Sequence, residues 1–151
     1  MKVKLLHEKA QLPKRGSEDA AGLDLYACED VFIPVGETRL VPLGIAIKLQ
    51  ARYGVIPYLK IEDRSGMAVK GLRTGAGVVD FDYRGEVKVV LHNLNNTSVM
   101  DPVLHRQGYR VMVGDRVAQG IICNAAMDEP VQALELDSTE RNAGGFGSTG
   151  S

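Results

Sequence analysis

Short polar clusters between apolar runs hold the residues of this chain that are best suited to chemistry. The run 20–25 places one carboxylate, Asp24, at the start of an apolar segment, whereas DRSG at 63–66 joins the Arg64 guanidinium and the Ser65 hydroxyl to the unobstructed backbone of Gly66. Charge combined with main-chain donors suits a bound anion. Neither cluster requires a ligand. Asp24 can cap its own turn, and DRSG at 63–66 can be an ordinary solvated turn.

The segment 77–87, GVVDFDYRGEV, carries two acids and a tyrosine between two apolar ends. Apolar runs that flank a loop with Asp, Arg and Gly predict a β-hairpin. Asp80 follows Val78 and Val79, and a carboxylate in such a partly dry place is suited to act as general base toward a water molecule. An ordinary polar hairpin tip is the alternative interpretation.

Two further clusters lie in the last third of the chain. GDRVAQ at 114–119 leads into an apolar run, so Gln119 is placed to aim an amide donor from a strand. The tail combines the Arg141 guanidinium group, glycine amides, hydroxyls and the ring of Phe146. This set of groups suits a nucleoside triphosphate. A solvated amide and a frayed terminus are the corresponding alternatives.

The elements that must position these clusters are predicted to be strands. Apolar residues alternate in short runs separated by Gly, Pro and Asn, and Ile45, Ile47 and Leu49 share one face of such a run. A short helix at 65–70 is the best helical segment, so we predict an all-β fold. The predicted strands are 3–6, 23–27, 38–41, 45–49, 55–61, 87–91, 109–113, 117–123 and 131–136.

Length and composition narrow the class of protein. The 151 residues suit one domain, which we place at 1–140, followed by a Gly-rich flexible arm at 141–151. A net charge of −1 argues against a nucleic-acid partner, and no apolar run is long enough to span a membrane. The isolated Cys28 and Cys123 predict neither a disulfide nor a zinc site. We expect a cytoplasmic protein, with a nuclear location also open.

Five motifs taken in order resemble those of the trimeric dUTPase family: AGLDL at 21–25, RSGMA at 64–68, GVVDFDYRGEV at 77–87, GDRVAQ at 114–119 and GGFGSTG at 144–150. The resemblance covers almost the whole chain. It implies a jelly-roll-like β-barrel in a homotrimer that hydrolyses dUTP to dUMP and pyrophosphate with Mg²⁺. Each active site would take motifs one, two and four from one subunit, the hairpin from a second and the tail from a third.

The resemblance also assigns roles to single residues. Asp80 would activate the water that attacks the α-phosphorus, and Asp24 would contact magnesium through water. Gly77 and Lys88 would read the uracil edge, and Tyr83 would pack on the deoxyribose. The remaining residues implied to bind substrate are Arg64, Ser65, Gly66, Gln119, Arg141, Phe146, Gly147, Ser148 and Thr149.

Three features depart from the family pattern: Asp63 replaces a usual proline, Asn142 replaces a usual glycine, and residues 98–107 form an insertion. We expect a surface hairpin at the insertion, which is a possible site for a protein partner. Two other functions stay open. A dCTP deaminase-like enzyme shares the family's fold and trimer, and a dUTPase-like regulatory protein would bind partners instead of hydrolysing nucleotide.

Overall fold

The computed structural model describes residues 1–51, 54–95 and 107–144, and these are almost entirely β-structure. The single helix among them is α1 (Ser65–Ala68). In chain order the strands are β1 (Lys2–Leu5), β2 (Lys14–Arg15), β3 (Leu23–Tyr26), β4 (Val31–Pro34), β5 (Thr38–Lys48), β6 (Ile56–Glu62), β7 (Leu72–Gly75), β8 (Val78–Val79), β9 (Val87–Asn93), β10 (Gly108–Val111) and β11 (Arg116–Ala125).

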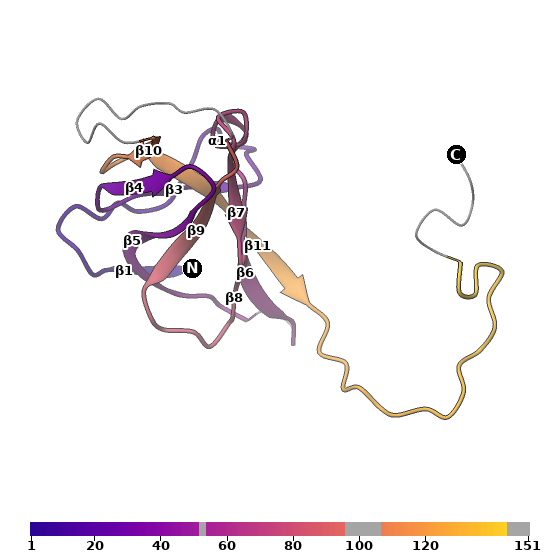
Figure 1. The fold of residues 1–151 in the computed structure, drawn as a ribbon. Coiled ribbons are helices and arrows are strands. Elements are labelled where there is room, and N and C mark those ends of the chain that lie inside the picture. Colours follow the sequence, from indigo (N-terminus) through magenta and orange to yellow (C-terminus); the bar gives the residue numbers. More distant parts are fainter. Residues whose placement is uncertain (52–53, 96–106, 145–151) are drawn as a thin grey trace.

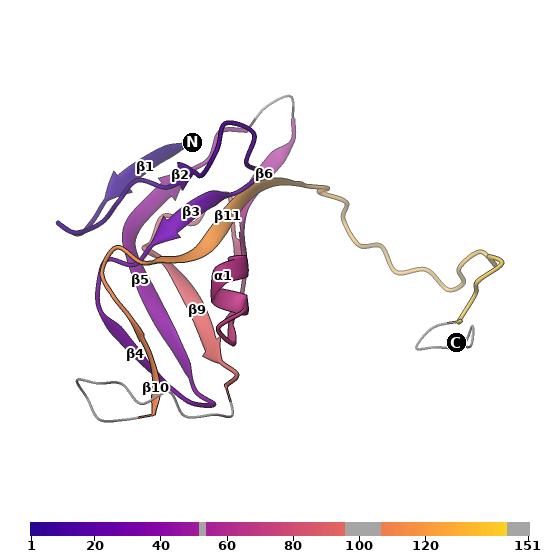
Figure 2. The ribbon, with the colours of Figure 1, turned by 90° about the horizontal axis from the view of Figure 1, so that it is seen from above.

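The strands form three antiparallel sheets, which lie around one interior in Figures 1 and 2. One sheet has the order β1-β5-β9-β7, the second has the order β2-β3-β11-β6-β8, and the third pairs β10 with β4. The predicted all-β fold is confirmed. Within the described residues the sheets do not close into one continuous barrel, because the ladders of the two large sheets are not joined.

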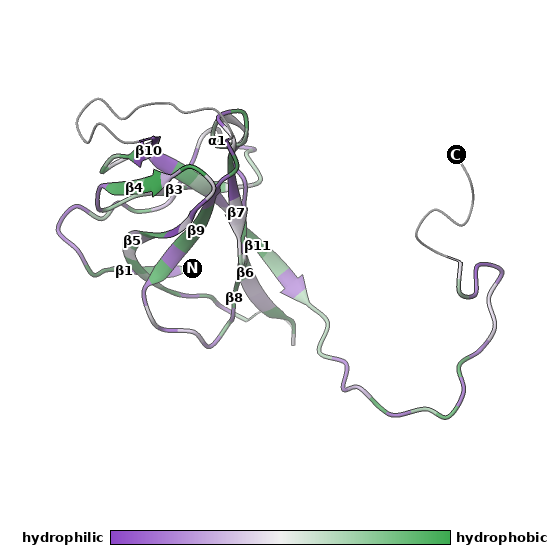
Figure 3. Ribbon diagram, in the orientation of Figure 1, coloured by the Kyte–Doolittle hydropathy of each residue, from purple (hydrophilic) through white to green (hydrophobic). Residues whose placement is uncertain are grey.

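The core lies between the two large sheets and is built by alternation along the strands. In β9, Val87, Val89 and Leu91 are buried, and in β6, Leu59 and Ile61 are buried. All five belong to one hydrophobic cluster. Figure 3 shows apolar residues along the strands of this body. Successive strand residues point to opposite faces. Burial of every second residue therefore places one side of each strand against the interior.

Strand β5 runs through the point where the sequence predicts a break between 38–41 and 45–49. Its pairing with β9 shifts register between Pro42 and Ile45, and Gly44 lies between them at φ +63°. Glycine adopts this left-handed conformation without steric cost, so the strand accommodates a bulge and continues. Two predicted strands are therefore one.

The predicted hairpin at 77–87 is wrong. Strand β8 pairs with β6, whereas β9 pairs with β5 and β7, so the two arms belong to different sheets. The loop between them crosses from one large sheet to the other. Apolar runs on both sides of a polar loop specify two half-buried strands, but they do not specify that these strands pair with each other.

The segment that follows β11 leaves the body of the molecule (Figure 1). Residues 126–143 are all exposed, including Val131, Leu134 and Leu136 at 87–98%. The strand predicted at 131–136 is not formed, because its alternating residues have no pairing strand in the described chain. Residues 98–106 of the insertion and Phe146, Gly147, Ser148 and Thr149 lie outside the described residues. No helix within the described ranges is long and apolar enough to cross a membrane.

Candidate active site

Three of the predicted site residues meet where β3, β11 and β6 lie side by side. Asp24 on β3 is directly opposite Gln119 on β11, and Gln119 is opposite Glu62, the last residue of β6. Two residues later the chain reaches Arg64, whose Nε lies 3.5 Å from Asp24 Oδ1. Sheet pairing thus brings together residues from three motifs that are far apart in the sequence.

Asp24 is only 5% exposed, and it is held by two guanidinium groups. Arg64 approaches one carboxylate oxygen, and Arg116 Nη1 donates to the other, Oδ2, at 3.2 Å. A buried carboxylate needs such partners because leaving a charge unpaired away from water is costly. Two positive charges against one negative charge leave a surplus of positive charge at this corner of the sheet, which suits an anionic ligand.

Arg116 was not among the site residues predicted from the sequence. In a regular strand, residues three apart point to opposite faces, so Arg116 and Gln119 would not share a site. The register of β11 on β3 shifts between Arg116 and Ala118, and this bulge turns Arg116 to the face of Asp24. The sequence contains one indication of this bulge, because the consecutive apolar residues Val117 and Ala118 break the alternation of a regular strand. In the structure both are fully buried.

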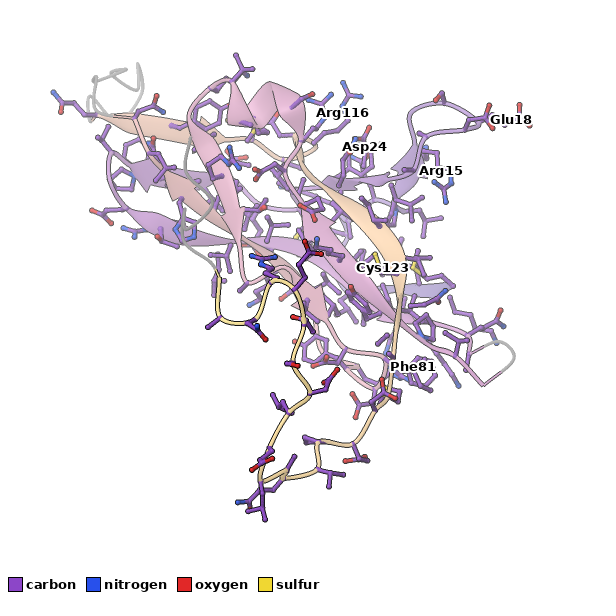
Figure 4. All side chains as sticks on the ribbon, turned by 90° about the vertical axis from the view of Figure 1, so that its right-hand side faces the viewer. Arg15, Glu18, Asp24, Phe81, Arg116 and Cys123 are labelled. Carbon is purple, nitrogen blue, oxygen red and sulfur yellow. The ribbon has the colours of Figure 1, made fainter. Side chains whose placement is uncertain are left out.

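Two glycines leave room for the side chains of this cluster. A Cβ on Gly22 would lie 3.0 Å from Gln119 Cβ and 3.1 Å from its Oε1, and a Cβ on Gly66 would lie 3.0 Å from Arg64 Nη1. Ser65 is exposed at the first position of α1. Arg15, the last residue of β2, donates hydrogen bonds to the carbonyl groups of Ala20 and Ala21 in the loop before β3, with 2.9 Å to the latter. These contacts tie the loop that leads to Asp24 to β2, and Arg15 and Asp24 are labelled in Figure 4.

The second group of predicted site residues lies in the loop between β8 and β9 and at the start of β9. Asp80, Tyr83 and Lys88 line a pocket of about 550 Å³, and all three are exposed in the single chain. The partly dry surroundings expected for Asp80 are therefore not formed by this chain alone. The lining residues are Leu40, Ala76, Val78, Val79, Asp80, Tyr83, Glu86, Val87 and Lys88.

Internal hydrogen bonds shape this loop. The Tyr83 hydroxyl donates to the Glu86 carbonyl oxygen at 3.0 Å, and Arg84 donates to the carbonyl oxygens of Phe81 and Tyr83 at 2.7 and 2.8 Å. Just before β8, Gly77 O accepts a hydrogen bond from Ile61 N–H at 2.6 Å. A Cβ on Gly77 would lie 2.5 Å from Ile61 O, so the chain entering β8 can approach β6 this closely only with glycine.

Glu86 is a second residue that the sequence analysis missed. Its Oε1 accepts a hydrogen bond from Gly44 N at 3.1 Å, and its Oε2 lies 3.3 Å from Lys88 Nζ. The carboxylate thus ties the pocket to the bulge of β5. Alternation around Lys88 predicts that Glu86 and Lys88 share a face, but the contact with Gly44 depends on the fold.

Within one chain the two groups lie at different ends of β6. Asp24 and Gln119 lie in the row of Glu62, whereas Asp80 follows Val79, the partner of Leu59, and borders a second pocket with Tyr58. The four steps along the strand from Tyr58 to Glu62 span roughly 13 Å at about 3.3 Å each. In Figure 4, Phe81, which directly follows Asp80, lies well apart from Asp24 and Arg116.

Arg141 lies near neither group. It belongs to the exposed segment that leaves the body, and its Nε donates to Gly144 O at 2.8 Å. Asn142 has φ +41°, and it exchanges hydrogen bonds of 3.0 Å with Thr139. Asn is among the residues that tolerate the left-handed region, which accounts for its presence where the family usually has glycine.

The described residues do not form a metal site of their own. Nowhere in this part of the chain do three His, Cys, Asp or Glu side chains gather closely enough to hold a metal ion. Both carboxylate oxygens of Asp24 already face guanidinium groups. This donor set does not fit an ion held directly by the protein. It fits an ion that a phosphate ligand carries together with its waters, because Mg²⁺ keeps several water ligands.

Comparison with known proteins places this geometry in one family. The model of the dUTPase family matches residues 8–150. A deoxyuridine 5'-triphosphate nucleotidohydrolase of Yarrowia lipolytica is 47% identical over 153 residues, which cover 99% of this chain and 88% of the relative.

Solved structures agree with this comparison. The dUTPase of Staphylococcus bacteriophage 80alpha with dUPNHPP has a TM-score of 0.82 at 26% identity, covering 99% of this chain and 98% of that one. A mutant dUTPase from the S. aureus phage phi11, whose structure details the coordination of a structural Mg(II) ion, has a TM-score of 0.75 at 26% identity, covering 91% and 98%. By sequence and by structure, this chain belongs to the dUTPase family.

Proposed function

We propose that this protein is a dUTP diphosphatase that hydrolyses dUTP to dUMP and pyrophosphate, and thereby serves nucleotide metabolism. Family membership supports the substrate, since the Yarrowia relative is named for this reaction and the 80alpha relative was solved with dUPNHPP. The observation that carries the proposal is the division of the site into a cationic corner and a separate pocket that contains a carboxylate.

The cationic corner is suited to the triphosphate. Arg64 and Gln119 would hold phosphate oxygens, with Ser65 and the Gly66 backbone beside them. Arg116 shares Asp24 with Arg64, so it supports the position of that carboxylate and adds positive charge. Guanidinium groups bind phosphate through paired donors, which favours a polyphosphate over a neutral ligand.

The pocket between β8 and β9 would take the nucleoside. Gly77 and the backbone of Lys88 would read the uracil edge, and Tyr83 would pack on the deoxyribose. The Gly77 carbonyl oxygen already accepts a hydrogen bond from the Ile61 N–H. The Gly77 N–H and the second lone pair of that oxygen therefore remain for the base. Reading by buried hydrogen bonds discriminates strongly, because a wrong base leaves polar groups unpaired.

Asp80 would accept a proton from a water molecule whose oxygen attacks the α-phosphorus. A bond from the water oxygen to the α-phosphorus forms while the bond from that phosphorus to the α,β-bridging oxygen breaks, and pyrophosphate leaves with the electron pair. A positioned general base of this kind contributes typically 10²–10⁴ in rate.

The distance of roughly 13 Å along β6 keeps Asp80 away from the phosphates held by Arg64 of its own chain. We therefore propose a homotrimer with shared sites, in which Asp80 acts on a triphosphate held by a neighbouring copy. The arm 141–151 of a third copy would close the site over the body 1–140. Arg141, Phe146, Gly147, Ser148 and Thr149 would then contact the substrate.

Magnesium enters this proposal bound to the triphosphate, where it would neutralise part of the phosphate charge. Asp24 would contact the ion through its water shell, in keeping with a carboxylate that two guanidinium groups already hold. The phi11 relative coordinates a structural Mg(II) ion. Hydrolysis should therefore stop on chelation and return on addition of Mg²⁺.

Mixing two inactive variants tests the shared site. Asp80→Ala keeps the arm, and a chain that ends at Glu140 keeps Asp80 but loses the arm, so each homotrimer lacks one part at every site. When the two are unfolded together and reassembled in equal amounts, random trimers should have about one quarter of their sites complete. Activity on dUTP should return to that level. Mixed trimers without recovery would show that both parts act within one subunit.

Substrate assays separate the proposal from its alternatives. Pyrophosphate release from dUTP without ammonia release from dCTP supports a diphosphatase, and the reverse result would identify a deaminase. Binding of dUTP without turnover would support a regulatory protein. Deletion of the insertion 98–107 should leave hydrolysis intact.

A further inference from the structure

Asp63 departs from the family pattern, and its side chain has an unusually complete set of partners. Its Oδ1 accepts hydrogen bonds from Thr74 N at 2.6 Å and from Thr74 Oγ1 at 2.9 Å, and Arg73 Nε lies 2.6 Å from its Oδ2. Both carboxylate oxygens are engaged, and the negative charge is paired. Hydrogen bonds to an ionised group are shorter and stronger than those between neutral groups.

These contacts join the two large sheets. Asp63 directly follows β6 of the five-stranded sheet, and Arg73 and Thr74 belong to β7, the edge strand of the four-stranded sheet. No ladder connects β6 with β7 among the described residues. The Asp63 carboxylate accepts the hydrogen bond from the Thr74 N–H of this edge strand, which a neighbouring strand would otherwise accept.

The contacts of Asp63 with Arg73 and Thr74 form a clamp, and this clamp ends one residue before Arg64. On its C-terminal side, the Arg64 carbonyl oxygen accepts hydrogen bonds from Met67 N at 2.8 Å and Ala68 N at 3.0 Å. On its N-terminal side, Arg64 is extended (φ −87°, ψ 125°), and no side chain caps α1. Asp63 thus does not cap the helix. It fixes the backbone from which the Arg64 guanidinium reaches Asp24.

We propose that Asp63 is a positioning residue for phosphate binding, which clamps the Arg64 backbone to β7 through Thr74 and Arg73. The inference rests on the proposed role of Arg64 in holding the triphosphate. A proline at this position would restrict the backbone covalently. Asp63 restrains it through contacts, and Arg73 offsets the negative charge that Asp63 brings near the phosphates.

The test compares binding of dUPNHPP with binding of dUMP, which lacks two phosphates, by calorimetry on the full-length protein. Asp63→Ala should weaken dUPNHPP binding about 10-fold or more, since small displacements of a binding group have large effects, and should change dUMP binding much less. Asp63→Asn keeps the acceptor for Thr74 and should recover part of the loss. Thr74→Val removes one contact and should give an intermediate loss.

A matched control is Glu37→Ala, which removes an acid that pairs with Arg39 and has no contact with Asp63, Arg73 or Thr74. It should leave both affinities unchanged. If Asp63→Ala lowers the melting temperature but binds both ligands as wild type does, Asp63 is only structural and the inference is wrong. If Asp63→Ala does not fold, wild-type dUPNHPP affinity in both Asp63→Asn and Thr74→Val overturns it equally.

Arg64→Ala separates this inference from the proposed function. Unchanged dUPNHPP affinity in Arg64→Ala would refute the phosphate role of Arg64 and, with it, the basis of the clamp. Weakened affinity in Arg64→Ala with unchanged affinity in Asp63→Ala would leave that role intact and refute the clamp alone.

Discussion

Arg116→Ala tests whether the bulge in β11 places this residue as a partner of Asp24. At 3.2 Å, the attraction between the two charges is about 5 kcal/mol at an effective dielectric constant of about 20. Desolvation of the carboxylate offsets much of this attraction, and the Arg116 side chain is 49% exposed while that of Asp24 is 7% exposed. Arg64 also remains as a partner. We therefore expect a net loss of about 1–2 kcal/mol in the free energy of unfolding.

The assay is a double-mutant cycle measured by urea unfolding at a fixed subunit concentration, because stability of an oligomer depends on concentration. In the Asp24→Ala background, Arg116 has no counterion and faces Arg64. Arg116→Ala should then cost less than about 0.5 kcal/mol, which gives a coupling energy of about 1 kcal/mol. Arg39→Ala, which breaks an exposed pair with Glu37, is the matched control and should cost less than about 1 kcal/mol.

An equal cost of Arg116→Ala in both backgrounds would refute the reasoning. It would mean that the contact between Arg116 and Asp24 contributes nothing to stability. The same variants report on function, since loss of Arg116 should also weaken dUPNHPP binding.

Three further predictions concern Asp80, Cys28 and Asp63. Asp80→Asn should bind dUPNHPP as wild type does but lower kcat about 10²-fold or more, and an unchanged kcat would remove Asp80 from the mechanism. Burial raises the pKa of the Cys28 thiol, with Glu29 and Glu86 adding to the effect, so Cys28 should stay unreactive toward thiol reagents until the protein unfolds. Faster native labelling of wild type than of Cys28→Ser would contradict this. Burial raises the pKa of Asp63, but hydrogen bonds from Thr74 and the charge of Arg73 outweigh it, so that pKa is lowered overall. The carboxylate therefore stabilises the fold above its unfolded pKa of about 3.9 and loses this effect as the pH falls through the folded value. The difference in unfolding free energy between wild type and Asp63→Asn should be largest near neutral pH and shrink below about pH 4, and a difference that grows on acidification would be the opposite of this expectation.

The class of the fold and the family can both be read from the amino-acid sequence. Alternation in β6 and β9 reports which side of each strand is buried, because burial of every second residue is a local property of an extended chain. The order of the five motifs identified the family, which the comparisons confirm. Both signals can be read along the chain without knowing which strands pair.

The grouping of the site residues, in contrast, depends on how the strands pair in three dimensions. Strands β8 and β9 do not pair, Arg116 turns to the face of Asp24 through a bulge, and Asp63 reaches β7 across a sheet boundary. Each of these depends on pairing between segments far apart in the chain, and the same pattern of apolar residues is compatible with several pairings. For the same reason, Asp80 and Arg64 are separated because their segments lie beside different residues of β6. Residue types and spacing alone do not reveal this arrangement.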